Sequence, residues 1–247
     1  MSSAETGSRA LPKPATKAVP VVFVVDDDVS VRESLELMIL QAGWHPKTFS
    51  SAEEFLAHPR LDGPSCLVLD VSLPDLNGLE LQKRIVDRTD MPIIFITGYG
   101  DVPTSVQAMK AGAAEFLTKP FNDDVLRNAI GQAIGRSLFE LAQEAELRAL
   151  RNLQATLTPR EREIMALVVT GRLNKQIAAE LGISEITVKA HRGRVMRKMN
   201  VDSLADLVRV AAALDESARR FTPRDRPHPH TGGSVPSTTS PAGTTAR

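Results

Sequence analysis

Four short apolar runs, each ended by a polar residue, constrain the fold of this chain more than any other feature. Continuous apolar runs of this length predict strands of a parallel sheet that is buried on both faces. Ligands of open α/β sheets bind at the edge formed by the carboxyl ends of the strands. A cluster of acids, a single acid, a hydroxyl and a lysine are expected to meet there, which suits a divalent metal and a phosphoryl group. The runs and the residues that end them are 21–25 with Asp26, Asp27 and Asp28, 66–69 with Asp70, 93–96 with Thr97, and 115–118 with Lys119.

Helical patterns alternate with these strands. Residues 30–42 place apolar side chains on one face and end at Gly43, and Ser51 opens the next helix at capping-box spacing from Glu54. A short strand over residues 45–49 and further helical segments complete five strand–helix units. This alternation predicts an α/β fold, a doubly wound five-stranded parallel sheet, which is comfortably housed in about 115 residues.

A second, smaller domain is expected over residues 157–215, where four short helices are predicted. Thr158, Asn174 and Ser184 are the expected N-caps of three of them. Between the two domains, residues 136–156 read as a helical linker, either a coiled-coil seam between two copies or a charged, solvated helix. We expect an α/β domain over 20–135, and disorder over 1–19 and 216–247, which are rich in Pro, Ser and Thr.

The zero net charge of the chain hides an asymmetry between its halves. Residues 20–122 carry 8 Lys and Arg against 15 Asp and Glu, whereas residues 158–214 carry 10 against 6. An acidic half and a basic half indicate different partners, a metal for the first and nucleic acid for the second.

Cysteine usage and hydropathy indicate a cytoplasmic protein. Cys66 is the single cysteine, so a disulfide framework is excluded. Because it lies inside an apolar run, its thiol is predicted to be buried. No apolar stretch approaches the roughly 20 residues that span a bilayer. No secretory signal is expected either, because the basic N-terminal residues are not followed by an apolar core.

Asp26, Asp27, Asp70, Thr97 and the Lys119-Pro120 step together resemble the receiver domain of two-component response regulators in order and spacing. The resemblance implies that Asp70 accepts a phosphoryl group, with Thr97 and Lys119 contacting its oxygens. It also implies a cis peptide bond between Lys119 and Pro120.

The same resemblance implies a Mg²⁺ site and a conformational switch. Asp27, Asp70 and the backbone carbonyl of Ser72 would bind the ion directly, and Asp26 mainly through water. Phe116 stands where the family places a switching aromatic, although a plain core phenylalanine is the alternative interpretation.

Three motifs in the basic half, at residues 157–163, 174–178 and 186–192, closely resemble the LuxR-type helix-turn-helix domain. Together with a receiver, this is the arrangement of the NarL/FixJ response-regulator family. The face of the helix over 184–199 that carries Val188, Val195 and Met199 should pack on the domain core, which leaves a basic face for DNA. The candidate DNA-binding residues are Lys175, Lys189, Ala190, Arg192, Gly193, Arg194 and Arg197.

The leading hypothesis is a phosphorylation-controlled transcription factor and not an enzyme. The resemblance implies a sensor histidine kinase as phosphoryl donor, dimerisation on phosphorylation, promoter DNA as the ligand and RNA polymerase as a further partner. One alternative is a phosphatase with an aspartate nucleophile, but such enzymes typically carry a second Asp two residues after the first, where this chain has Ser72. The other alternative is a DNA-binding protein that does not depend on phosphorylation, against which the intact set of acids, Thr97 and Lys119 argues.

Overall fold

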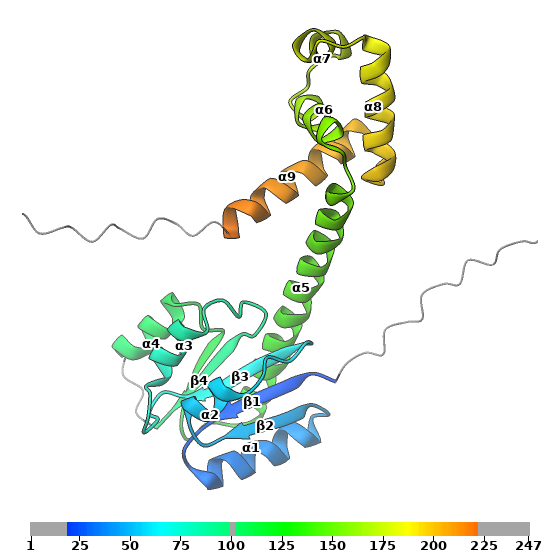
Figure 1. The fold of residues 1–247 in the computed structure, drawn as a ribbon. Helices are drawn as coiled ribbons and strands as arrows, with labels where there is room; N and C mark the ends of the chain where they lie inside the picture. The colour runs from blue at the N-terminus through cyan, green and yellow to red at the C-terminus, as the bar shows by residue number, and fades with distance from the viewer. Residues whose placement is uncertain (1–18, 99–101, 222–247) are drawn as a thin grey trace, which may run out of the picture. The chain divides into compact units, whose positions relative to one another are not determined.

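The computed structural model describes residues 19–98 and 102–221, and its contacts divide the chain into two compact units, with the division inside one helix between Arg148 and Ala149. The first unit is built on a five-stranded parallel sheet with the strand order β2-β1-β3-β4-β5 (Figure 1). Its strands are β1 (Val21–Val25), β2 (His45–Phe49), β3 (Ser65–Asp70), β4 (Ile93–Thr97) and β5 (Glu115–Thr118). The predicted doubly wound five-stranded sheet is therefore confirmed.

Helices cover both faces of this sheet, which explains why the interior strands β1, β3 and β4 are apolar without alternation. The edge strands β2 and β5 are only partly buried, and the expected burial of residues 115–118 was wrong at Glu115 and Thr118, which are exposed. Alternate residues of β1 and β3 point to opposite faces: Phe23 and Leu67 pack towards α2, α3 and α4, and Val24 and Val68 towards α1 and α5. Cys66 is fully buried on the second face, and burial raises the pKa of its thiol to about 12. The helices of this unit are α1 (Val29–Gln41), α2 (Ala52–Ala57), α3 (Gly78–Arg84), α4 (Val102–Lys110) and the larger part of α5 (Asp123–Ala155), whose end belongs to the second unit.

The second unit is helical and has its own apolar core, which includes Ile164, Ile177, Val188 and Leu207. Two of the predicted N-caps are confirmed, because Thr158 accepts a hydrogen bond from the Glu161 amide and Ser184 accepts one from the Thr187 amide. Its complete helices are α6 (Pro159–Val169), α7 (Asn174–Leu181), α8 (Glu185–Lys198) and α9 (Leu204–Phe221).

Two expectations about helix ends were wrong. Asn174 is the first residue of α7 rather than its cap, and the Leu173 amide is instead bonded by the side chain of Gln176 at 2.9 Å. Residues 216–221, expected to belong to a disordered tail, are instead helical, because α9 continues to Phe221. Its extension is held by Ser217, which is buried and accepts a hydrogen bond from Arg151 at 3.0 Å.

Of the segments expected to be disordered, 1–19 and 216–247, residues 1–18 and 222–247 lie outside the described residues. The predicted linker, 136–156, falls almost entirely within α5, which is continuous with the helix that packs on the sheet. In the part of the chain that the structure describes, no helix has the length and apolarity needed to cross a membrane.

Candidate functional site

Strand register brings the predicted acids together at the carboxyl edge of the sheet. Val25 of β1 pairs with Leu69 of β3, so the next residues on these neighbouring strands are Asp26 and Asp70. Asp27 follows on the turn into α1, and one carboxylate oxygen from each of these three acids lies within 4.8 Å of the others. Asp26 and Asp70 are buried, whereas Asp27 is exposed, so the cluster is open to solvent on one side.

Lys119 bridges the two buried acids. Its Nζ lies 2.6 Å from Oδ2 of Asp26 and 2.7 Å from Oδ2 of Asp70. Burial raises the pKa of Asp26, a shift that the bond from Lys119 opposes without cancelling it. Burial also acts to lower the pKa of Lys119, but the bonds to the two carboxylates outweigh it and the net shift is upward. Lys119 is therefore charged at neutral pH and occupies the position of a counterion between the acids.

The donor set around Asp70 fits a small divalent cation. Three carboxylates offer the oxygen ligands that Mg²⁺ prefers, and the open side at Asp27 leaves room for the waters that this ion retains. The Ser72 amide donates to Oδ1 of Asp70 at 2.9 Å, so the chain turns locally at Asp70 where the predicted carbonyl ligand follows. Asp28 stays out of the cluster and caps α1 by accepting from the Ser30 amide at 2.8 Å.

Thr97 and Phe116 lie on the neighbouring strands β4 and β5. Thr97 is fully buried at the end of β4, and its carbonyl accepts from the Lys119 amide at 2.7 Å, which ties the strand ends together. The Lys119-Pro120 bond is cis, as the resemblance implied. Phe116 is half-buried and its ring lies 6.2 Å from that of Phe95, so it contacts the core without being enclosed by it.

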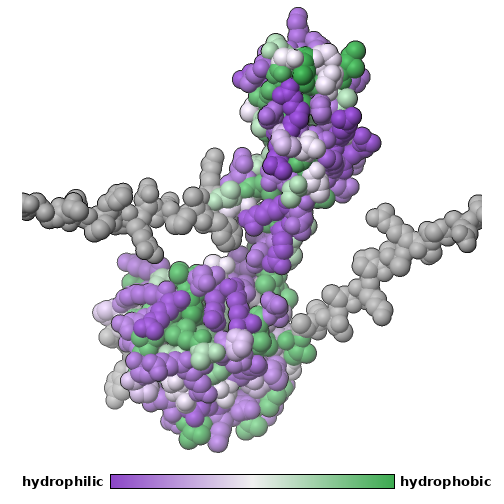
Figure 2. Space-filling view, in the orientation of Figure 1, coloured by the Kyte–Doolittle hydropathy of each residue, from purple (hydrophilic) through white to green (hydrophobic). Residues whose placement is uncertain are grey.

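In the second unit, α8 separates a core face from a solvent face as predicted. Val188, Val195 and Met199 are at most 1% exposed. Figure 2 shows hydrophilic residues gathered over α8. The residues of the predicted DNA-binding set that are exposed are Lys175, Lys189, Ala190, Gly193, Arg194 and Arg197.

Comparison with known proteins assigns a family to each of the two domains. The family model described as the response regulator receiver domain matches residues 22–131, and that of the bacterial regulatory proteins of the luxR family matches residues 155–211. Nodulation protein W of Bradyrhizobium diazoefficiens is 48% identical over 205 residues, which cover 83% of this chain and 89% of that protein. Transcriptional regulatory protein FixJ of Rhizobium meliloti is 44% identical over 196 residues, covering 78% and 95%. The solved structure of the response regulator StyR, 46% identical, covers 79% of this chain and 99% of that one with a TM-score of 0.70.

The chain is a response regulator of the NarL/FixJ family. It joins a receiver to a LuxR-type helix-turn-helix domain, and it is a transcriptional regulator activated by phosphorylation.

Two predicted DNA-binding residues of this regulator have intramolecular partners, and the first, Arg197, donates to the Gly193 carbonyl within α8 at 3.3 Å. Arg192 is half-buried, and its guanidinium donates to Oδ1 of Asn174 at 2.7 Å, which ties α8 to the start of α7. Arg172, which precedes α7, forms an exposed ion pair with Glu180 on that helix. Of these three contacts, the bond of Arg192 joins two helices of the motif.

Two residues that contact the backbone of the acid cluster, Gly78 and Arg32, were not predicted from the sequence. A Cβ placed on Gly78 would lie 2.5 Å from the carbonyl oxygen of Asp70, so only glycine allows α3 to approach the end of β3 this closely. Arg32 of α1 donates from its guanidinium to the carbonyl oxygen of Asp26 at 2.7 Å. The only sequence signals were a glycine at a helix start and a basic residue six positions after the first acid.

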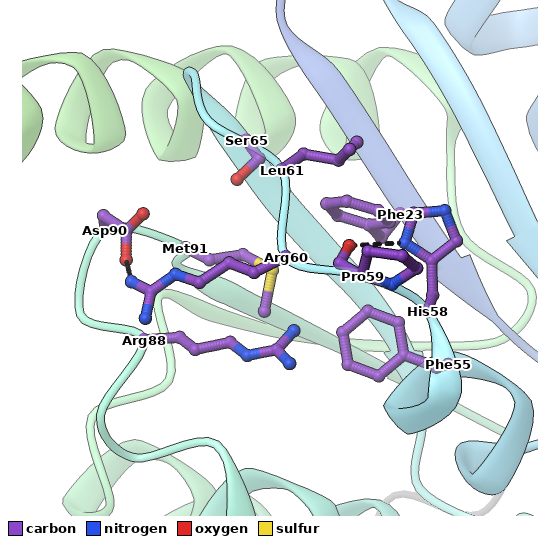
Figure 3. A pocket seen from close by; sticks show the side chains of 10 residues that line it. All are labelled: Phe23, Phe55, His58, Pro59, Arg60, Leu61, Ser65, Arg88, Asp90 and Met91. Atoms are coloured by element: carbon purple, nitrogen blue, oxygen red, sulfur yellow. Dashed lines mark hydrogen bonds and ion pairs between the residues drawn. The ribbon is translucent and has the colours of Figure 1, made fainter.

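A hollow lies at the opposite edge of the sheet, where β3 and β4 begin. Figure 3 shows the rings of Phe23 and Phe55 and the side chains of Arg60 and Arg88 among the residues that line it. Arg60 pairs with Asp90 at 2.5 Å, and the guanidinium of Arg88 lies 5.4 Å from the centre of the Phe55 ring. The acid cluster is the better candidate site in the receiver, because it brings three carboxylates together with one ammonium group, whereas the charge of Arg60 is matched by that of Asp90.

The helix-turn-helix domain should lose stability in strong acid through Glu161. This carboxylate is 3% exposed, and the bonds from Lys198 at 2.6 Å and from the Thr158 amide lower its pKa from 4.5 to about 2. A depressed folded-state pKa stabilises the fold above the unfolded value, and this contribution is lost as the pH falls from 4.5 through about 2. We expect Glu161→Gln to weaken the domain at pH 7, with a difference from native that shrinks over this range.

Hydrogen exchange of the α6 and α8 amides during denaturation of the full chain measures the difference in stability between native and Glu161→Gln. Glu163→Gln is the matched control, because Glu163 lies on the same helix and its side chain is 55% exposed in its pair with Arg160. A Glu161→Gln difference that stays constant down to pH 2 would exclude the ion pair as its cause.

Proposed function

We propose that Asp70 is the phosphoacceptor and that a phosphohistidine of a sensor histidine kinase is the donor. A carboxylate oxygen of Asp70 would attack phosphorus as the bond to the imidazole nitrogen breaks, giving an acyl phosphate. The observation that carries the proposal is the bridge of Lys119 between Asp70 and Asp26, which places a fixed positive charge 2.7 Å from the attacking group. Lys119 and the hydroxyl of Thr97 would then contact phosphoryl oxygens.

Mg²⁺ is the proposed cofactor of this step. Asp27, Asp70 and the Ser72 carbonyl would hold the ion directly, and Asp26 mainly through water. When bound, Mg²⁺ neutralises the charge that develops on the transferred phosphoryl group. The mutual proximity of the three acids within 4.8 Å supports this assignment.

Phosphorylation would shift the receiver between two states, with Phe116 turning inward as Thr97 moves towards the phosphoryl group. We propose that the activated chain dimerises and places two copies of α8 on neighbouring half-sites of promoter DNA. Lys189 is the best candidate for a base contact, and Lys175 and Arg192 for phosphates. The other proposed contact residues on this surface are Ala190, Gly193, Arg194 and Arg197.

The remaining assignments follow from the family. We propose a receiver over residues 20–135, a helical linker over 136–156 and a DNA-binding domain over 157–215, in a cytoplasmic protein that acts with RNA polymerase. The chain itself would act as a regulator and not as an enzyme with its own substrate.

The test compares native chain with Asp70→Ala, with and without acetyl phosphate and Mg²⁺. Intact-protein mass reports phosphorylation, light scattering reports the oligomeric state, and titration of mixed-sequence duplex DNA at fixed salt reports affinity. We expect phosphorylation, a dimer and tighter DNA binding only in the treated native sample. The control Asp62→Ala removes an exposed acid from the same domain and should behave as native. Equal dimerisation and DNA binding in all samples would contradict control by Asp70.

A further inference from the structure

Arg32 reaches from α1 to the backbone of the acid cluster. Its side chain is half-buried, and one guanidinium nitrogen donates to the carbonyl oxygen of Asp26 at 2.7 Å. Asp26 directly follows Val25, the last residue of β1, so this carbonyl lies where the strand has ended and the chain turns. The bond therefore closes the turn between β1 and α1 from its helical side.

The rest of Asp26 is also held. Its amide donates to the Phe49 carbonyl at 3.2 Å, and its two carboxylate oxygens accept from the Asp28 amide at 2.9 Å and from Lys119 at 2.6 Å. With the amide and the side chain fixed, the carbonyl bond to Arg32 sets the plane of the peptide that joins Asp26 to Asp27. The orientation of this plane determines where the side chain of Asp27 starts.

Asp27 depends on this backbone more than its neighbours do. It is exposed, whereas Asp26 and Asp70 are buried and are bonded directly by Lys119. Its carboxylate nevertheless lies in the cluster, within 4.8 Å of the other two. The peptide plane held by Arg32 is thus a means of keeping this carboxylate turned towards Asp70 before a cation arrives.

We propose that Arg32 is a positioning residue for the divalent cation, acting through the Asp26–Asp27 peptide to preorganise the carboxylate of Asp27. The inference rests on the proposed function of the acid cluster. Groups that orient metal ligands from outside the ligand set typically change metal affinity by about 10- to 100-fold when they are removed.

The charge of Arg32 and its positioning role predict opposite changes in Mg²⁺ affinity when the side chain is replaced. Arg32 is a cation beside a cation site, so removing its charge alone should tighten Mg²⁺ binding. Loss of positioning should weaken it. The direction of the change in affinity therefore separates the two effects without any assumption about their size.

The experiment is calorimetric titration of Mg²⁺ into the full chain at pH 7 and constant ionic strength. The variants are Arg32→Gln, Arg32→Lys and the control Arg127→Gln, which removes the same charge from an exposed ion pair with Asp124 on α5. Phosphorylation by acetyl phosphate is then measured at saturating Mg²⁺. We expect the Kd for Mg²⁺ to rise about tenfold in Arg32→Gln and less in Arg32→Lys. The rate at saturation should stay within about twofold of native, because filling the site restores the ligand set.

Thermal unfolding without Mg²⁺ shows whether each variant is folded, and Arg32→Lys keeps the test valid if Arg32→Gln is not. An unchanged or lower Kd in a folded Arg32 variant would overturn the inference, and so would an equal rise in Arg127→Gln. Failure of the native chain to bind Mg²⁺ more tightly than Asp70→Ala would instead overturn the metal site of the proposed function. The two failures are therefore distinguishable within one set of titrations.

Discussion

Gly78→Ala should destabilise the receiver by about 2 kcal/mol and slow its phosphorylation by about tenfold or more. The added Cβ would lie 2.5 Å from the carbonyl oxygen of Asp70, 3.1 Å from the Cα of Val71 and 3.2 Å from the ring of Phe95. Two of these neighbours are backbone atoms at the end of an interior strand, and the Gly78 amide also donates to the Val71 carbonyl at 3.0 Å. Relief of the clash must therefore move either α3 or the end of β3 that carries Asp70.

Urea unfolding and the rate of phosphorylation by acetyl phosphate measure the two effects. Gly135→Ala is the matched control, since nothing lies within 4 Å of its added Cβ on α5 and alanine favours a helix by about 1 kcal/mol. We expect this control to be at least as stable as native and to be phosphorylated at the native rate. Native behaviour of Gly78→Ala would show that α3 can withdraw without disturbing Asp70.

Lys119→Met should cost about 3 kcal/mol of receiver stability at pH 7 in the absence of divalent cations. It removes the ammonium group that bridges Asp26 and Asp70. Among the described residues, the fully buried carboxylate of Asp26 then keeps the Asp28 amide as its hydrogen-bond donor. Mg²⁺ should restore much of the loss, because the ion supplies the missing counter-charge. Phosphorylation should stay slow even then, since the contact from the ammonium to the phosphoryl group is gone.

Thermal unfolding with and without Mg²⁺ tests this prediction against Lys110→Met, which removes an exposed lysine from the last turn of α4. Mg²⁺ should raise the stability of the Lys110→Met control by no more than it raises that of the native chain. If Lys119→Met were as stable as native without Mg²⁺, the bridge would contribute nothing to the fold, and its role would be limited to the transfer step.

Sequence reasoning located the acid cluster because the cluster is built from strand ends. Each apolar run stops where its strand leaves the sheet, and parallel strands all end at one edge, so Asp26, Asp70 and Thr97 had to lie near one another. The faces of α8 were equally predictable, since helical periodicity alone separates Val188 and Val195 from Lys189. Knowledge of the family added the roles of these residues.

Contacts between segments that lie apart in the sequence were not predictable. No pattern in the chain shows that Arg151 bonds Ser217 and thereby extends α9, or that Arg192 bonds Asn174. The requirement for glycine at position 78 could not be predicted for the same reason, since it is imposed by the backbone of Asp70, which passes beside it.

The sequence by itself determined the sheet, the order of its elements and the edge at which the acids gather, because periodicity and strand ends are local properties of the chain. Only the tertiary structure decided that Lys119 bridges two of those acids, that Arg32 braces the peptide between Asp26 and Asp27, and that α3 touches Asp70 through Gly78. Hydrogen bonds and close approaches depend on distances of a few tenths of an ångström between separate elements, and such distances are set by how the helices pack on the sheet.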